Sequence, residues 1–338
     1  MTAKAKPGKP GKAKRLAVFN PPLAAPINRW FGKLRPMEPR TREEPFDNPR
    51  YYFQIKWDGI RILAFVDKGE VRLQNRRGRE RTFQYPELQE LGGRLENRVA
   101  ILDGEVIIME KGKPNFPRVM QRDSCSREQV LAHLLPVHPV TYCIFDLLFL
   151  DGEDLTSRPY CYRQSRLVSL IKESYGAVYL NENFDSGKSL YRWMAERGWE
   201  GVVAKEKTGR YTWGPNKSSG WFKIKVRRQQ LCLVGGLSRA EGAPAALLLG
   251  VYRDGEITYI GKAGSGLTRQ DLLELDRLAD RSLQAEPCFV NPPREKGLVW
   301  LKPDLTVLVE YAEWTANLRL RAPVIKGFTT QPVAEARL

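Results

Sequence analysis

The pattern of apolar residues changes near Arg228, and this change constrains the fold more than any other feature of the sequence. Before Arg228, apolar runs of strand length alternate with segments in which apolar residues recur every three or four positions. After it, short strand-like runs separated by glycine turns dominate. A chain of 338 residues is long enough for two domains. We therefore expect an α+β domain over residues 30–228, followed by an all-β domain over residues 229–338.

The first region contains most of the expected strands and helices. Strands are predicted at residues 51–56, 61–66, 70–74, 98–109, 140–148, 201–205 and 221–226. Helices are predicted at residues 127–135, 162–173 and 188–197. The proline-bearing run 36–49 is expected to be irregular.

The second region predicts a small barrel. Strands are expected at residues 231–237, 246–252, 256–261 and 305–311, the last being the final strand. A helix opened by a capping box of Thr268 and Asp271 lies between the third and fourth strands. Four or five strands with one inserted helix fit the OB fold, a common nucleic-acid-binding scaffold, although an unrelated β-barrel would give the same pattern.

The charge balance favours a polyanionic partner. Lysine and arginine number 55 against 39 acidic residues, a net charge of +16. No apolar run approaches the ~18–20 residues of a membrane-spanning helix, so we expect the partner to be nucleic acid rather than a membrane. The alternative is a basic protein whose charge serves only its solubility. Residues 1–29 are expected to form a basic flexible tail and lead-in. Lys12, Lys14 and Arg15 in this tail are either DNA-phosphate contacts or part of a solvated end.

Cysteine usage indicates the compartment. The five cysteines are scattered without a CxxC pair and only two histidines are present, so structural zinc is not expected. An odd number of cysteines without a signal peptide fits a reducing cytoplasm. We expect a cytoplasmic protein associated with the nucleoid.

The tetrapeptide KWDG at residues 56–59 stands where a strand breaks into a turn. A free lysine amine has a pKa of ~10.4 and is almost entirely protonated at pH 7, so a nucleophilic lysine needs a nearby cation or metal that favours its neutral form. Lys205, Lys223 and Lys225 are candidate cations, and Glu200 with Glu105 could hold a metal. Alone, such a tetrapeptide is common in exposed turns.

Further segments follow KWDG in a recognisable order. They are NRRG at residues 75–78, DGE at 103–105, FD at 145–146, EGVVAK at 200–205 and WFKIK at 221–225. Together with KWDG, and with the start of a last motif at residues 320–328, they resemble the motifs of the covalent nucleotidyltransferase superfamily of ATP-dependent DNA ligases, RNA ligases and capping enzymes. Within it, the chain is most similar to the ligase module of bacterial ligase D. The likeness runs from about Pro36 to Gly327.

The resemblance implies a role for each motif residue. Lys56 would carry AMP, Arg61 would contact the ribose, and Gln54 and Ile55 would line the nucleotide site, Gln54 at a position where relatives often have a glutamate near the adenine amino group. Arg76 would contact a phosphate and Glu105 a ribose hydroxyl.

The later motifs imply base, metal and phosphate contacts. Phe145 would stack on adenine, Glu200 would bind the metal, and Lys205 would contact the α-phosphate. Strand alternation places Glu200 on the face of Val202 and Ala204, opposite to Lys205. Lys223 and Lys225 share a face of one strand, which suits a bound phosphate between them.

The second region carries two more likenesses. Residues 259–267, YIGKAGSGL, resemble a segment of the ligase D barrel. Residues 320–328 resemble the start of the family's last motif, but TTQP follows where an Arg-x-Asp-Lys is expected. In the family that motif orients the leaving pyrophosphate. The other expected DNA contacts are Arg227 and Arg228 at the end of the first region, and Lys262 and Lys326 in the second.

The resemblance therefore implies an ATP-dependent DNA ligase with a nucleotidyltransferase domain and an OB barrel. It would use ATP and Mg²⁺, with Mn²⁺ as a substitute, to seal nicked or broken double-stranded DNA in repair such as non-homologous end joining. Its partners would be a Ku-like end-binding protein and a repair polymerase. The alternatives are an RNA ligase of the same superfamily, or a basic end-binding factor without catalysis, which the altered last motif favours.

Overall fold

The computed structural model describes residues 26–338, except residues 127, 129–133, 215–216, 241 and 316. These residues form two compact units, which divide between Ile224 and Lys225. Most of the helix expected at residues 127–135, and the tail residues Lys12, Lys14 and Arg15, lie outside the described residues. Among the described ones, no helix has the length and apolar character needed to cross a bilayer.

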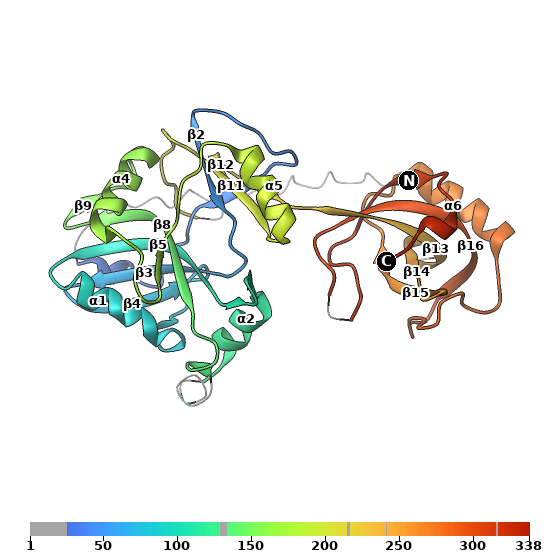
Figure 1. Ribbon diagram of the computed structural model, residues 1–338, viewed down its shortest axis with the longest axis horizontal. Coiled ribbons are helices and arrows are strands. Elements are labelled where there is room, and N and C mark those ends of the chain that lie inside the picture. The colour runs from blue at the N-terminus through green and yellow to red at the C-terminus, as the bar shows by residue number, and fades with distance from the viewer. Residues whose placement is uncertain (1–25, 127, 129–133, 215–216, 241, 316) are drawn as a thin grey trace, which may run out of the picture. The chain divides into compact units, whose positions relative to one another are not determined.

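The first unit contains two main sheets (Figure 1). The six-stranded sheet has the order β10-β8-β5-β3-β4, with β9 paired to β8, and the four-stranded sheet has the order β1-β12-β11-β2. The strands are β1 (Glu38–Thr41), β2 (Tyr51–Ile55), β3 (Ile60–Asp67), β4 (Glu70–Asn75), β5 (Val99–Ile107), β8 (Thr141–Leu150), β9 (Glu153–Asp154), β10 (Val178–Leu180), β11 (Gly201–Glu206) and β12 (Lys217–Lys225), with a small hairpin of β6 (Met109–Glu110) and β7 (Lys113–Pro114). The helices are η1 (Ile27–Trp30), η2 (Thr82–Gln84), η3 (Pro86–Gln89), α1 (Glu90–Arg94), α2 (Phe116–Ser124), α4 (Tyr160–Ile171) and α5 (Gly187–Arg197).

Both faces of the six-stranded sheet are buried, which explains why β3 and β8 read as unbroken apolar runs. On one face, Ile62 and Ala64 pack with helix residues such as Leu167 of α4. On the other, Leu63 and Phe65 belong to a cluster that includes Trp221 of β12. This second cluster joins the two sheets, and the candidate site lies beside it.

The second unit is a five-stranded sheet of order β15-β14-β13-β16-β17 with one helix inserted before β16. Its elements are β13 (Arg228–Ala240), β14 (Ala243–Arg253), β15 (Glu256–Ala263), α6 (Arg269–Ser282), β16 (Leu298–Tyr311), β17 (Val324–Thr329) and η5 (Val333–Glu335). Backbone hydrogen bonds from Leu320 to Ile260 and from Ile325 to Ser265 connect the two edges of the sheet. The strands expected at 231–237, 246–252 and 256–261, the inserted helix and the Thr268–Asp271 capping box are confirmed.

Four expectations about elements were wrong. Residues 38–41 form β1 within the run expected to be irregular, because they pair with β12 in parallel. The strand expected at 98–109 stops at Ile107, and the β6–β7 hairpin follows. The strand expected at 305–311 begins earlier, at Leu298. Its pairing with β13 shifts register between Val234 and Gly236, and this shift leaves room for Pro303, which has no pairing partner on β13. It is not the final strand either, because β17 pairs with β16.

Adjacent residues on α4 provide a test of the core. Leu167 is fully buried, whereas Val168 is 47% exposed. We expect Leu167→Ala to lower the free energy of unfolding by about 2–5 kcal/mol, because it leaves a cavity between α4 and the sheet. Val168→Ala, the matched control, should change it by about 0.5 kcal/mol at most. Urea unfolding followed by tryptophan fluorescence would measure both, and equal effects would contradict this packing.

Candidate active site

Lys56 lies immediately after β2, where the chain remains paired with β11. Its backbone N–H donates to the carbonyl of Gly201 over 2.9 Å. Its Nζ lies 2.5 Å from Oε2 of Glu200, and the two side chains are 19% and 18% exposed. The site therefore holds a solvent-accessible amine against a carboxylate from a residue 144 positions later in the chain.

Glu200 does not follow the strand alternation expected from the sequence. The strand β11 begins at Gly201, whose φ of 145° lies in a region that favours glycine. The alternation of β11 therefore does not extend to Glu200, whose carboxylate contacts Lys56 instead of following Val202 and Ala204. Antiparallel pairing sets Gln54 opposite Val203 and Tyr52 opposite Lys205. Since opposite residues share a sheet face, Gln54 and Lys205 lie on the same face.

The turn after Lys56 is held by close packing. A Cβ atom on Gly59 would lie 2.2 Å from the carbonyl oxygen of Val106, so only glycine fits there. Trp57 is buried, donates from Nε1 to Oδ1 of Asn181 over 3.2 Å, and packs against Trp199 with ring centroids 5.3 Å apart. These contacts explain the KWDG sequence and restrain the backbone on both sides of Lys56.

Arg61 forms a two-pronged ion pair with a buried acid. Its Nε and Nη2 donate to the two oxygens of Asp103 over 2.6 and 2.7 Å, and the Tyr211 hydroxyl also donates to Asp103 over 2.7 Å. The guanidinium lies 4.6 Å from the centroid of the Phe145 ring. Asp103 and Tyr211 thus fix the arginine, and Tyr211 is a positioning residue that sequence reasoning missed.

Glu105 provides the second acid of the site. It lies opposite Arg61 in the pairing of β5 with β3. Burial of its carboxyl group raises the pKa of Glu105 to about 7, Arg61 and Lys56 oppose this shift, and Glu200 and Asp103 add to it. Glu105 is thus close enough to interact electrostatically with both Glu200 and Lys56.

These two carboxylates fit a magnesium ion that is shared with a phosphate. The described residues contain no group of three or more histidine, cysteine, aspartate or glutamate side chains that could hold a metal by themselves. Mg²⁺ commonly takes one or two carboxylates and completes its coordination with water and substrate phosphates. The donor set is therefore suitable for a metal that arrives with a nucleotide, and it is not a preformed cage.

Lys205 lies in an aromatic cage beside Phe145. Its Nζ lies 3.9 Å from the Phe145 ring centroid and 4.1 Å from that of Trp221, and it donates to the Tyr160 hydroxyl over 3.3 Å. The residue is 2% exposed, and burial lowers the pKa of Lys205 well below its usual value. The structure thus brings the predicted phosphate contact and the predicted stacking residue together. Sequence reasoning missed Tyr160, because the apolar spacing of its helix gives no sign of a functional residue there.

The remaining nucleotide residues occupy different surroundings. Gln54 is buried in β2, as is Ile55, which pairs with Val202. Arg76 forms an ion pair with Glu38 of β1. The alternation of β12 places Lys223 and Lys225 on the face of Trp221. Lys223 lies opposite Thr41 in the pairing with β1.

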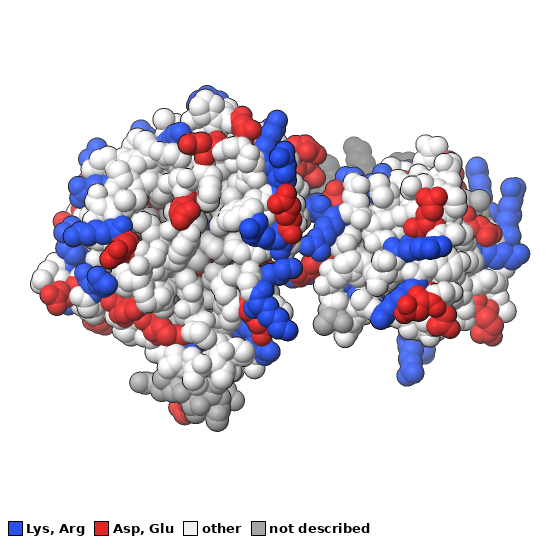
Figure 2. Space-filling view, viewed as in Figure 1, with Lys and Arg blue, Asp and Glu red and all other residues white. Residues whose placement is uncertain are grey.

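Three of the four predicted DNA contacts of the second unit are paired with acids. Arg227 and Lys326 lie 2.7 and 3.7 Å from the carboxylate of Glu310, and Lys262 lies 2.5 Å from that of Glu295. Arg228 is exposed at the start of β13. Figure 2 shows acidic side chains interspersed among the basic ones on the visible face of each unit.

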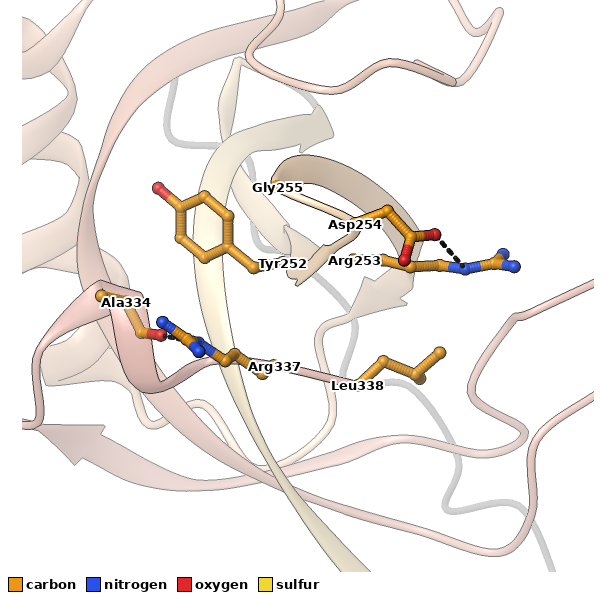
Figure 3. Close-up of a pocket in the computed structure, with 7 residues that line it drawn as sticks. All are labelled: Tyr252, Arg253, Asp254, Gly255, Ala334, Arg337 and Leu338. Carbon is orange, nitrogen blue, oxygen red and sulfur yellow. Dashed lines mark hydrogen bonds and ion pairs between the residues drawn. The ribbon is translucent and has the colours of Figure 1, made fainter.

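A pocket in the second unit lacks the features of a nucleotide site. It encloses about 520 Å³ and is shown in Figure 3. Its lining includes Arg253, which pairs with Asp254, and Arg337, which donates to the Ala334 carbonyl. Its arginines are thus already bonded within the pocket. None of the predicted nucleotide residues lines it.

Comparison with known proteins agrees with this site. A sequence profile described as "ATP dependent DNA ligase domain" matches residues 37–225, and one described as "ATP dependent DNA ligase C terminal region" matches residues 240–331. The multifunctional non-homologous end joining DNA repair protein LigD of Mycobacterium tuberculosis is 32% identical over 286 residues, which are 82% of this chain and 36% of that protein. A DNA ligase of Thermococcus fumicolans is 31% identical over 276 residues, covering 77% of this chain and 47% of that one.

Solved structures extend the likeness to the fold. The crystal structure of the ligase domain from M. tuberculosis LigD is 30% identical, with a TM-score of 0.54 over 91% of this chain and 99% of that one. A mycobacterial DNA ligase D complexed with ATP and MES also gives a TM-score of 0.54, at 30% identity over 90% of this chain and 98% of that one. The chain spans about a third of the length of the LigD relatives, 36% for the mycobacterial proteins. Since the ligase profile matches more than half of the chain and includes every residue of the Lys56 site, this chain belongs to the ATP-dependent DNA ligase family.

Proposed function

We propose that this protein is an ATP-dependent DNA ligase that seals nicks or broken ends through an AMP carried on Lys56. The observation that carries the proposal is the accessible Lys56 amine, held 2.5 Å from Glu200 and next to Glu105, in a chain of the ligase family. A lysine that served only the fold would have no need of two carboxylates around an accessible amine. The arrangement suits transfer of a nucleotidyl group.

In the first step, the Lys56 nitrogen attacks the α-phosphate of ATP. A P–N bond forms, the bond from the α-phosphorus to the bridging oxygen breaks, and pyrophosphate leaves. The ammonium proton must depart first, and the Glu200 carboxylate is within reach to accept it. Magnesium held by Glu105, Glu200 and phosphate would add positive charge beside the amine and the phosphate oxygens, favouring the neutral amine and the reaction.

The aromatic cage suits the base and the phosphates. A purine that stacks on Phe145 would gain about 1–3 kcal/mol from the contact. The Lys205 ammonium lies over this ring, so a base that stacks on the same face would displace it. Because burial disfavours its charged form, an adjacent α-phosphate would stabilise the ammonium in its new position.

The later steps act on DNA. AMP passes from Lys56 to a 5′-phosphate, and a neighbouring 3′-hydroxyl then displaces it to join the strands. The net charge of +16 supports binding to a phosphate backbone. We propose repair of breaks by non-homologous end joining, as in the names of the LigD relatives, with a Ku-like protein and a repair polymerase as partners.

The first test is formation of the covalent adduct. Incubation with α-labelled ATP and magnesium should label the protein so that the label survives a denaturing gel. Lys56→Ala should abolish labelling, because it removes the nucleophile, and should leave DNA binding nearly unchanged. Lys113→Ala, at an exposed lysine of β7, is the matched control and should label normally. A Lys56→Ala protein that still labels would refute the assignment, and an unlabelled wild type would favour a non-catalytic end-binding factor.

The raised pKa of Glu105 predicts that the magnesium requirement depends on pH. With a pKa of about 7, the carboxylate is mostly protonated at about pH 6 and mostly ionised at about pH 8. The magnesium concentration that half-saturates adenylation should therefore be about tenfold higher at the lower pH. Glu105→Gln should weaken the magnesium dependence and remove its change with pH, whereas Glu153→Gln, at a residue of β9 that pairs with Arg158, should not. A requirement that stays constant from pH 6 to 8 would contradict a metal role for Glu105.

The altered last motif predicts unequal rates for two steps. Attack on ATP needs the pyrophosphate oriented, whereas sealing of a nick that already carries 5′-AMP does not. With TTQP at residues 329–332, we expect single-turnover sealing of a pre-adenylated nick to be faster than self-adenylation. Arg321→Ala and Lys326→Ala should slow adenylation only, if these residues supply the pyrophosphate contact. Adenylation that is faster than sealing, and indifferent to both changes, would show that the altered motif is no handicap.

A further inference from the structure

Two tryptophans flank the reactive pair of the candidate site. Trp57 directly follows Lys56, and Trp199 directly precedes Glu200. Their indole rings contact each other, with centroids 5.3 Å apart and an interplanar angle of 43°. Consecutive Cα atoms are only about 3.8 Å apart, so each ring is attached to the backbone next to the group it flanks. We call Trp57 and Trp199 the indole pair.

The indole pair lies where the backbone pairing of β2 with β11 ends. The last paired residues are Ile55 and Val202, and one further backbone hydrogen bond joins the Lys56 N–H to the Gly201 carbonyl. Glu200 precedes β11, so the pairing of the strands does not by itself fix its position. The ring contact extends the connection between the two segments beyond the end of the strands, on the side where Glu200 lies.

The first indole is held by the six-stranded sheet. The Trp57 Nε1 group donates to Oδ1 of Asn181 over 3.2 Å. Asn181 is 4% exposed, and its backbone N–H donates to the Ile144 carbonyl of β8 over 2.9 Å. The ring of Tyr179, in β10, lies edge-on to Trp57 with centroids 5.9 Å apart. Trp57 is therefore a fixed surface against which a second ring can be placed.

The second indole is held by the end of α5. The Trp199 backbone N–H donates to the Met194 carbonyl over 2.9 Å, after Gly198 ends the helix in the left-handed conformation. The ring also contacts Trp193, with centroids 6.3 Å apart. Its Nε1 atom is buried and has no hydrogen-bond partner among the described residues. Trp199 thus acts through the packing of its ring, and that ring connects α5 to Trp57.

We propose that Trp57 and Trp199 are positioning residues for the adenylation step, because their ring contact keeps the Glu200 carboxylate within reach of the Lys56 amine. This inference rests on the proposed roles of Lys56 and Glu200 and goes beyond them. Among the described residues, neither indole is one of the groups that contact the Phe145 ring. The indole pair should therefore affect the rate of attack on ATP and leave the affinity for ATP unchanged.

Single-turnover adenylation with α-labelled ATP tests this proposal. Trp199→Ala removes the ring contact, and a displacement of about 1 Å between reacting groups can slow a reaction about 100-fold. We expect the rate at saturating ATP to fall by about 10- to 100-fold, while the ATP concentration that gives half the maximal rate changes by less than about twofold. Trp199→Phe should recover most of the rate, because a phenyl ring can still pack against Trp57 and no hydrogen bond from Nε1 is lost.

A matched control separates positioning from a loosened helix. Leu190 is 3% exposed on α5 and adjoins neither Lys56 nor Glu200 in the sequence. Leu190→Ala should keep the rate of adenylation at a temperature at which circular dichroism shows the variant to be folded. An equal slowing in Leu190→Ala would overturn the proposal. An unchanged rate in Trp199→Ala would also overturn it, as would a loss that a higher ATP concentration restores, or one that Trp199→Phe does not recover.

A double-mutant cycle tests whether the two rings act as one unit. Trp57→Leu removes the ring and keeps an apolar side chain in the buried position. Combined with Trp199→Ala, it should be no slower than the slower single variant, because the first change already removes the contact. Effects that multiply would overturn the proposal, since each ring would then act alone. An unlabelled wild-type protein would overturn the proposed function, whereas a labelled one whose variants are all indifferent would overturn this inference alone.

Discussion

The antiparallel pairing of β2 with β11 is the constraint on which the candidate site depends. It brings the end of one short strand to the beginning of another that lies about 145 residues later, and so places the Lys56 amine against Glu200. The same register sets Gln54 and Lys205 on a shared face. A slip of one residue would turn all these side chains to the opposite face. Gly201 and Gly59 permit the tight backbone geometry at the two ends of this arrangement.

Two arginines around this pairing are each matched by a buried aspartate. Arg163 and Asp146 are both fully buried and bonded through two contacts of 2.8 and 2.9 Å. Arg61 and Asp103 form a similar pair. Loss of one partner from such a pair commonly costs about 3–5 kcal/mol. These pairs fix side chains of β5 and β8 beside the site, where burial also displaces the pKa values of Lys205 and Glu105.

Much of the fold could be predicted because its signals are local. The β-rich run after Tyr51, the capping box at Thr268 and the glycine turns after Arg228 all depend on neighbours within a few residues. The elements that were missed depend on distant partners. The strand β1 is recognisable only through its pairing with β12, and β17 only through β16. The full length of β16 could not be predicted, because Pro303 argues against a strand in the sequence. A proline inside a strand is tolerated only where a bulge removes the need for a hydrogen bond.

The sequence by itself determined which chemical groups are present and in what order: an amine after a strand, two acids, an aromatic ring and a series of cations. It also determined the family, because the ordered motifs are local strings of residues. Only the tertiary structure decided what each group contacts, since those contacts join residues far apart in the chain. Asp103 and Tyr211 hold Arg61, Glu200 contacts Lys56, and Asn183 bonds to Gln54. Hydrogen bonds are directional and short, so these roles arise only when the packed sheets bring the partners within about 3 Å.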